Sequence, residues 1–461
     1  MAWSFILKAG DEVLLVTLLA LVLLLTPHLN LELRVSSYQI SPWYLKILWG
    51  SLALISWSIA VRIAQAQELE NASNRLKSPL YALFALVLML IFWIALTYPI
   101  IISGIVYSRA VLFFLILAAP TLSVWRVILA EVINLPRFRR QAVIVGVNTA
   151  GEAFVRELRS AKRTSISVLG YISQNSDEGQ QSGGLPILGG RSSLRPLAQN
   201  GVIDIIIMAI DYKANPGLYQ EAFEGAQRGI SVVPVAAVYE STSGKIPLDH
   251  IGDQWSIAFS TEQLVSALYL CWNKAIDLVF GICGLVLLCI VLPVLSLLIY
   301  LDSPGPIFFS QERAGYRGRT FRMLKFRSMC TSAERAESGA WTSKGDARVT
   351  RVGRLLRATH LDELPQVLNI VRGDMSLIGP RPERPEYVVE LVKSNLFYSY
   401  RLSVKPGLTG WAQVKYGYGS SEQEELVKLQ YDLFYIKHRS FLLDVLILLK
   451  TVREVVLCHG T

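Results

Sequence analysis

The sequence IDLVFGICGLVLLCIVLPVLSLLIYL, from Ile276 to Leu301, is the stretch that decides the fold. It is apolar over more than the roughly 20 residues that a helix needs to cross a bilayer. Pro293 lies inside it, removes a backbone hydrogen bond and can bend a helix sharply. The stretch therefore predicts a membrane helix that is interrupted near Pro293.

Basic residues flank this helix on both sides. Arg228, Lys245 and Lys274 lie upstream, and a run of basic residues with only Glu312 as an acid lies downstream: Arg313, Arg317, Arg319, Arg322, Lys325 and Arg327. Basic flanks favour the cytoplasmic side of a membrane. We therefore expect a re-entrant helix at about residues 275–301, which enters the membrane, breaks near the proline and leaves on the same side. A straight span is the alternative.

Four further apolar stretches precede this helix, at residues 13–29, 43–61, 80–101 and 105–124. Basic residues lie between the second and third stretches and after the fourth: Arg62, Arg75, Lys77, Arg126, Arg137, Arg139 and Arg140. Because cytoplasmic loops are enriched in lysine and arginine, this pattern predicts a four-span helical bundle with both ends in the cytoplasm. The spans lack the acids that a transport path requires, so we interpret the bundle as an anchor.

The composition is typical of a membrane protein with two or three folding units. Of 461 residues, 52% are hydrophobic and 18% are charged, and the net charge is +9. The excess of basic over acidic residues indicates contact with the phosphates of lipid headgroups or nucleotides. No RNA-binding signature is present, so nucleic acid is not an expected partner. The five cysteines and five histidines show no metal-ligand spacing, so we expect no zinc site.

Residues 136–265 alternate strand-like and helix-like segments, which predicts a Rossmann-like α/β domain. The turn from Gly146 to Gly151 keeps the outer glycines of a dinucleotide fingerprint but has Asn148 in place of the second glycine. The acid expected after the second strand is also missing. This pattern favours a structural or regulatory domain, with nucleotide binding as the alternative.

The residues with the strongest chemical signal lie in the last third of the chain. Asp362 and Glu363 introduce a helix-like run in which Pro365 suits the first turn and Gly373 suits the stop. A helix N-terminus favours ionised carboxylates and nearby phosphate. Arg357 lies five residues earlier, and Arg381 stands between two prolines further on. Cations around a carboxylate are what phosphoryl transfer needs, although basic residues can also simply bind lipid headgroups. Trp411 can likewise be a membrane-interface anchor.

Five ordered motifs carry a specific family resemblance: KFRSM (residues 325–329), DARVTRVGRLLR (346–357), LDELPQ (361–366), GDMSLIGPRP (373–382) and KPGLTGWAQV (405–414). With them, the run from about Lys274 to the end resembles the catalytic unit of the bacterial polyprenyl-phosphate sugar-1-phosphate transferases, the monotopic phosphoglycosyl transferases. The whole chain resembles the large members, which begin exopolysaccharide repeat units and act on undecaprenyl phosphate and UDP-glucose or UDP-galactose.

The resemblance implies a mechanism. Asp362 would attack the β-phosphate of a UDP-sugar, release UMP and carry the sugar phosphate until undecaprenyl phosphate accepts it. Asp362 would also touch Mg²⁺, and Glu363 would assist the metal or proton transfer. Lys325, Arg357 and Arg381 correspond to phosphate-binding positions, and Arg327, in the same motif as Lys325, is also assigned to substrate binding. Pro293 corresponds to the proline at which the family's re-entrant helix breaks.

The expected architecture is therefore a four-helix transmembrane bundle (1–135), a Rossmann-like cytosolic domain (136–265) and an α/β-type monotopic catalytic domain with the re-entrant helix (266–461). The site would face the cytoplasm from a bacterial inner membrane, in contact with membrane lipids, and large relatives suggest a homodimer. Two other functions stay open. One is a noncatalytic scaffold or regulator of polysaccharide assembly. The other is a nucleotide-sugar oxidoreductase or epimerase that uses the middle domain.

Overall fold

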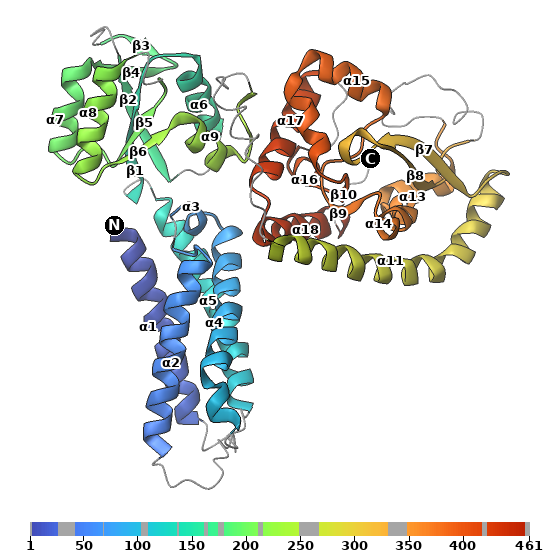
Figure 1. The fold of residues 1–461 in the computed structure, drawn as a ribbon, viewed down its shortest axis with the longest axis horizontal. Helices are drawn as coiled ribbons and strands as arrows, with labels where there is room; N and C mark the ends of the chain where they lie inside the picture. Colours follow the sequence, from blue (N-terminus) through green and yellow to red (C-terminus); the bar gives the residue numbers. More distant parts are fainter. Residues whose placement is uncertain are drawn as a thin grey trace. The chain divides into compact units, whose positions relative to one another are not determined.

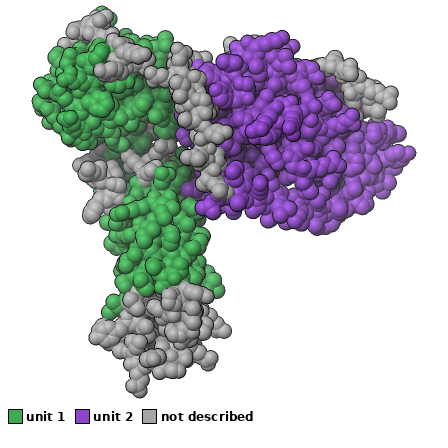
Figure 2. All heavy atoms as spheres, viewed as in Figure 1, with its two compact units in different colours: residues 1–242 green, residues 243–461 purple. Residues whose placement is uncertain are grey.

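The computed structural model forms two compact units, Met1–Thr242 and Ser243–Thr461 (Figure 2). It describes residues 2–25, 42–67, 69–102, 109–135, 138–160, 165–173, 179–210, 215–248, 267–330, 348–416 and 422–456. Residues 26–29 and 105–108 of the expected spans, Arg137 in the basic flank and Asp346 in one motif lie outside these ranges.

Four long helices at the start of the first unit pack side by side (Figure 1). They are α1 (Ala2–Leu25), α2 (Pro42–Ile63), α4 (Lys77–Ile102) and α5 (Arg109–Ile133), with the short helix α3 (Leu69–Ala72) between α2 and α4. Their shared core contains small and large apolar side chains, among them Leu15, Trp57, Ala85 and Leu122. Arg126 and Asp11 form an ion pair that is completely buried, as buried charges require a partner.

Three helices in the described part of the chain are long and apolar enough to cross a membrane, at residues Lys77–Leu96, Leu112–Ile133 and Leu268–Asp302. The first two belong to the bundle, and a shorter apolar segment there spans Gly50–Ile63. Two of the four expected bundle spans are thus long and apolar enough to cross a membrane in the described part of the chain.

The rest of the first unit is a doubly wound α/β domain, as the sequence predicted. Its sheet has the order β3-β4-β2-β1-β5-β6, and every pairing is parallel except β3 with β4. The strands are β1 (Arg140–Val145), β2 (Ile166–Ile172), β3 (Gln181–Ser182), β4 (Leu185–Gly189), β5 (Ile205–Met208) and β6 (Ser231–Pro234). Helices α6 (Thr149–Ser160) and α9 (Val235–Ser243) pack on one face, and α7 (Arg191–Gln199) and α8 (Pro216–Gln227) on the other.

Asn148 fills the position at which a dinucleotide fingerprint would admit a pyrophosphate. Its side-chain oxygen accepts a 2.9 Å hydrogen bond from the backbone N–H of Gly151 in α6, and its amide donates to the carbonyl of Ala209 after β5. Because β1 and β5 are neighbours, these bonds cross the edge of the sheet where such folds bind ligands. Both polar groups of the Asn148 side chain are thus engaged, and the structural or regulatory role of this domain stays a prediction.

The second unit combines helices with two small sheets. It starts with α11 (Ala267–Asp302), the hairpin of β7 (Phe308–Ala314) and β8 (Thr320–Phe326) with the 3₁₀ turn η3 (Tyr316–Gly318), and α13 (Arg351–Ala358). The 3₁₀ helix η4 (Leu361–Gln366) runs directly into α14 (Val367–Arg372). Then come β9 (Ser376–Ile378), α15 (Pro385–Ser394), η5 (Leu396–Ser403), β10 (Gly407–Thr409), α16 (Trp411–Tyr416), α17 (Glu422–Lys437) and α18 (Phe441–Val456), with β9 and β10 parallel.

Helix α11 is attached to the second unit near both of its ends. Near its start, the carboxylate of Asp277 accepts a 2.7 Å hydrogen bond from the backbone N–H of Leu377. At its end, the carboxylate of Asp302 accepts a 2.8 Å bond from the N–H of Val352. The helix continues through Pro293, so the expected break is not an end of helical structure. Figure 1 shows its C-terminal part turning toward β7.

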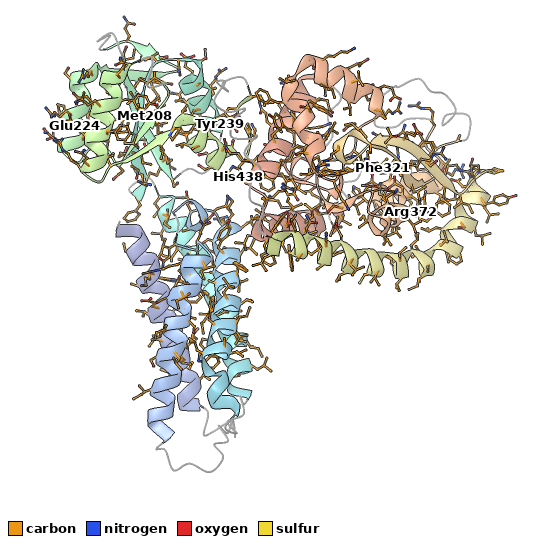
Figure 3. All side chains as sticks on the ribbon, in the orientation of Figure 1. Met208, Glu224, Tyr239, Phe321, Arg372 and His438 are labelled. Atoms are coloured by element: carbon orange, nitrogen blue, oxygen red, sulfur yellow. The ribbon has the colours of Figure 1, made fainter. Side chains whose placement is uncertain are left out.

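The face of α11 that points away from the second unit is apolar and exposed, and side chains project from it in Figure 3. Ile290 is 68% exposed, and the other exposed apolar residues include Leu278, Val279, Ile282, Val286, Val294 and Leu297. The opposite face buries Ile276, Leu288 and Ile299. A stripe of this extent requires an apolar environment.

Candidate active site

Local backbone conformation places Asp362 and Glu363 at the start of a continuous helical segment. His360 has a left-handed conformation (φ 57°), which redirects the chain after α13. The segment then runs through η4 and α14 and ends at Gly373, whose φ of 85° suits a glycine. The predicted stop at Gly373 is thus confirmed, and both acids lie in the first turn of η4, whereas Pro365 lies inside η4, two residues before α14 begins.

Glu363 is the centre of a charged cluster that three separate segments build. Lys325 of β8 contacts its Oε1 through Nζ at 2.8 Å, and the Nη2 of Arg381 contacts the same oxygen at 2.6 Å. The Nη1 of Arg381 lies 3.4 Å from Oε2 of Glu363 and 3.2 Å from Oε1 of Gln413. Burial opposes the ionisation of Glu363, but the charges of Arg381 and Lys325 outweigh it, so the pKa of this carboxyl lies well below its usual range.

Asp362 lies beside this cluster, but no hydrogen bond or ion pair engages its carboxylate among the described residues. Asp362 is buried, with 8% of its surface exposed. Burial raises the pKa of Asp362 above its ordinary value, against the opposing charges of Lys325, Arg357 and Arg381. The charges of Arg381 and Lys325 therefore favour the ionised form of Glu363, whereas for Asp362 desolvation is the stronger effect; the expected effect of the helix start stays a prediction.

Arg357 reaches this region from the last turn of α13. The helix is fixed at its start by the Thr350 side chain, whose oxygen accepts a 2.9 Å hydrogen bond from the N–H of Gly353. Gly353 and Leu356 are buried, so Arg357 lies at the margin of the packed face. Three of the predicted phosphate-binding cations, Lys325, Arg357 and Arg381, thus come together around Asp362.

Arg327 does not lie in this cluster, which corrects the sequence-based assignment of this residue to substrate binding. Its side chain is 1% exposed, and its Nη2 donates to the backbone carbonyls of Ile299 and Ser303 at the end of α11. Cations stabilise the carboxyl ends of helices. Arg327 therefore joins β8 to the membrane helix.

Gln413 is a site residue that sequence reasoning missed, although its motif was recognised. It lies in α16 and accepts the hydrogen bond from Arg381 described above. Trp411, at the start of the same helix, is 3% exposed and donates from Nε1 to the carbonyl of Gly244 at 2.9 Å. The tryptophan is a core residue, so its interpretation as a membrane-interface anchor is wrong.

The donor set near Asp362 fits a magnesium ion held largely by substrate. In the described ranges, no three His, Cys, Asp or Glu side chains are grouped to hold a metal ion. Mg²⁺ commonly uses one or two carboxylates and fills its other positions with water and substrate phosphates. Asp362 has a carboxylate available for that role, whereas the oxygens of Glu363 already bind two cations.

The site and the apolar helix beside it are typical of a membrane-associated protein with a buried carboxylate in a basic environment. Comparison with known families agrees. Residues 268–458 match the bacterial sugar transferase family, and residues 73–218 match a family described as a CoA-binding domain.

Three relatives show how far the similarity extends. The chain is 38% identical over 231 residues to a UDP-N-acetylgalactosamine-undecaprenyl-phosphate N-acetylgalactosaminephosphotransferase of Aeromonas hydrophila, covering 50% of this chain and 53% of that protein. It is 43% identical over 157 residues to a UDP-glucose:undecaprenyl-phosphate glucose-1-phosphate transferase of Xanthomonas campestris pv. campestris, covering 34% and 32%. It is 39% identical over 156 residues to the uncharacterized sugar transferase EpsL of Bacillus subtilis (strain 168), covering 34% and 73%.

The chain belongs to the bacterial sugar transferase family. The resemblance to polyprenyl-phosphate sugar-1-phosphate transferases that the motifs indicated is confirmed. The chain spans about half or less of the length of the first two relatives.

Proposed function

We propose that the protein transfers a sugar 1-phosphate from a UDP-sugar to undecaprenyl phosphate and releases UMP, as a first membrane step of exopolysaccharide assembly. The observation that carries this proposal is the buried Asp362 carboxylate, which is free of hydrogen bonds among the described residues and lies within the charge field of Lys325, Arg357 and Arg381. The printed activities of the Aeromonas and Xanthomonas relatives support the reaction class.

In the first proposed step, a carboxylate oxygen of Asp362 attacks the β-phosphorus of the UDP-sugar. The bond from that phosphorus to the bridging oxygen breaks, and UMP leaves with the bond's electron pair. In the second step, a phosphate oxygen of undecaprenyl phosphate attacks the same phosphorus, and the bond to Asp362 breaks. The Asp362 carboxylate is restored, and the product is undecaprenyl diphosphate with the sugar attached to its terminal phosphate.

The cations in the cluster would stabilise the charge that develops on the phosphate oxygens. Arg381 is oriented for this by Glu363 and Gln413, and Lys325 is oriented by Glu363. Glu363 thus acts as a holder of these two side chains in our proposal, which extends the metal-assisting role that the resemblance implied. Bound Mg²⁺, with Asp362 as its protein ligand, would supply further neutralisation of the donor diphosphate.

A membrane-embedded α11 would bring the lipid acceptor to this site. The apolar outer face of α11 and its attachments at Asp277 and Asp302 to one body support a helix that returns to the side it entered. In our proposal the four-helix bundle anchors the chain in a bacterial inner membrane, with membrane lipids around it and the site on the cytoplasmic side. A homodimer is part of the same proposal.

The test is UMP release by the purified full chain with undecaprenyl phosphate, Mg²⁺ and a panel of UDP-sugars. We expect release from at least one donor by the wild type and a loss of at least about 1,000-fold in Asp362→Asn, because the amide is not a nucleophile. Equal release by both proteins would remove Asp362 from the mechanism. No release from any donor would favour a noncatalytic scaffold.

An oxidoreductase or epimerase function of the middle domain is the less favoured alternative. The Asn148 side chain, bonded to Gly151 and Ala209, lies where a cofactor pyrophosphate would approach the backbone. Saturable binding of NAD in a titration would restore that alternative.

A further inference from the structure

The loop that presents Arg381 is held by close backbone approach on one side. The N–H of Gly379 donates to the carbonyl of Thr409 at 2.9 Å, and the N–H of Gly407 donates to the carbonyl of Pro380 at 2.8 Å. A Cβ atom on Gly407 would lie 2.1 Å from the backbone nitrogen of Gly379, so a side chain there would separate the two strands. These contacts fix the start of the loop.

The far side of the loop is held by β7. The N–H of Ala314 donates to the carbonyl of Glu383 at 2.8 Å, and the Nη1 of Arg313 donates to the carbonyl of Pro382 at 3.1 Å. Arg313 also lies 3.6 Å from the carboxylate of Glu383. Arg381 is therefore followed directly by two residues whose backbone is bound to one strand.

The Glu383 carboxylate connects the loop to a second buried guanidinium. Arg401 is 7% exposed and approaches Glu383 at 3.8 Å, while its Nε donates to Asp432 at 2.7 Å and its Nη1 donates to the hydroxyl of Tyr398. Asp432 is 1% exposed. Arg401 and Asp432 form a buried ion pair, as buried charges require, and the partly buried Glu383 lies beside it.

We infer that Glu383 is a positioning residue that holds Arg381 in its phosphate-binding place by bridging the guanidinium groups of Arg313 and Arg401. This inference rests on the proposed function, because it assigns Arg381 to the donor phosphates. Burial lowers the pKa of Arg313 to about 10; the charge of Glu383 opposes this lowering, and the like charge of Arg381 adds to it. Without the bridge, the loop loses a side-chain tie immediately after Arg381.

Positioning and simple charge predict opposite outcomes for Glu383→Gln. If the carboxylate acted only through its charge, its removal would make the region more positive and tighten binding of an anionic donor. If it positions Arg381, its removal lowers kcat/KM, because small displacements of a positioning group cost up to about 100-fold in rate. Weaker binding of the donor by Glu383→Gln therefore indicates positioning, and tighter binding indicates an effect of charge alone.

The experiment compares the wild type with Glu383→Gln, Glu383→Asp and Glu386→Gln in the full chain. Glu386 is an exposed acid in the first turn of α15 and serves as the matched control. The measurements are kcat and KM for UMP release from whichever of UDP-glucose, UDP-galactose and UDP-N-acetylgalactosamine the wild type uses, the Kd of UDP, and the melting temperature.

We expect Glu383→Gln to lower kcat/KM about 10- to 100-fold and to weaken UDP binding, Glu383→Asp to recover part of both, and Glu386→Gln to match the wild type. If Glu383→Gln does not fold, the same comparison is made with Glu383→Asp, for which we expect a smaller loss in the same direction. Unchanged or tighter UDP binding, with unchanged kcat/KM, would overturn the inference. If the wild type releases no UMP, the proposed function fails, and UDP binding by the same variants still decides the role of Glu383.

Discussion

Asp362 and Glu363 are neighbours in the chain, yet the pKa values of their carboxyl groups shift in opposite directions. Glu363 is bound directly by Lys325 and Arg381, and those contacts outweigh its desolvation. The carboxylate of Asp362 makes no direct contact with these cations, so desolvation has the larger effect on its pKa. Environment alone can therefore give two adjacent acids different pKa values, which is consistent with the separate roles that we propose for them.

Replacing Asp362 by asparagine should stabilise the fold at neutral pH. A folded-state pKa above the unfolded value favours the folded state at low pH, and that contribution is lost as the pH rises through the folded pKa. Asparagine does not ionise. We expect the melting temperature of Asp362→Asn, relative to the wild type, to increase between about pH 4 and pH 8. A constant difference across this range would contradict the burial effect; Asp374→Asn, also in the second unit, is the control.

Replacing Glu363 by glutamine should have the opposite effect on stability. The depressed pKa of Glu363 stabilises the fold above the unfolded value near about 4.3, and this contribution is lost only as the pH falls through the lower folded value. The variant leaves Lys325 and Arg381 without their shared anion, which we expect to cost about 3–5 kcal/mol. Chemical unfolding at pH 7 measures this; a loss below about 1 kcal/mol would mean that the pairing is solvated.

The sequence predicted most of the site at this scale, because charged residues in ordered motifs are visible without a fold. The sequence-based prediction was wrong for the role of Arg327. This residue follows the last residue of β8, and its side chain donates to the carbonyl of Ile299 near the end of α11. The prediction also missed Gln413, because a neutral amide gives no charge signal and its partner Arg381 is 32 residues away.

Among the elements, two glycines let α11 approach α14, the helix that continues from the η4 turn. A Cβ atom on Gly284 would lie 2.7 Å from Cγ2 of Val367, and one on Gly281 would lie 2.9 Å from Cγ2 of Val371. Val367 begins α14 immediately after η4. The membrane helix therefore packs directly behind the segment that carries Asp362.

A larger side chain at Gly284 should displace α14 and reduce turnover. Overpacking typically costs about 1–3 kcal/mol, and here the displaced helix continues from the turn that carries Asp362, the proposed nucleophile. We expect Gly284→Leu to lower the rate of UMP release by at least about tenfold, as small misplacements of catalytic groups do. The control is Cys283→Leu, which changes an exposed neighbour on the same helix. Equal rates for both variants would show that α14 is not held by this contact.

Local patterns predicted the strands of the α/β domain well, since β1, β2, β5 and β6 are short apolar runs between turn residues. The short antiparallel pair of β3 and β4 shows no such pattern, because the two residues Gln181–Ser182 carry no periodic signal. Helical structure continues through Pro293, and the C-terminal part of α11 turns toward β7 (Figure 1), so the re-entrant path near this proline stays a prediction. Proline disfavours a helix interior without forbidding it, and attachments at Asp277 and Asp302 hold the helix on both sides of the proline.

At the scale of the whole molecule, the topology of α11 decides on which side of the membrane the second unit lies. Its length and apolar composition are sufficient for a crossing, whereas its attachments near both ends to one body favour a return to the same side. Charge bias gave the same answer from the sequence. The packing adds a physical argument for a return to the same side. The sequence could not supply this argument, because Asp277 and its partner Leu377 are 100 residues apart.

Cysteine labelling at Ser303 tests this topology. Ser303 follows the last residue of α11, and its backbone carbonyl accepts from Arg327. In a background without native cysteines, we expect a membrane-impermeant maleimide to modify Ser303→Cys in inside-out vesicles at least about tenfold faster than in intact spheroplasts, because the bilayer excludes the charged reagent. Lys274→Cys, before the apolar run, should show the same sidedness. Modification of Ser303→Cys only from the periplasm would establish a straight span.

The most direct measurement of the central claim is mass spectrometry of the full chain after reaction with the UDP-sugar that supports UMP release, with the lipid acceptor omitted. We expect a hexose phosphate, or its N-acetylated counterpart, bound to the Asp362 carboxylate as an acyl phosphate in the wild type, no adduct in Asp362→Asn, and loss of the adduct when undecaprenyl phosphate is added. An active wild type that carries no adduct on Asp362, or carries it on another residue, would contradict the account.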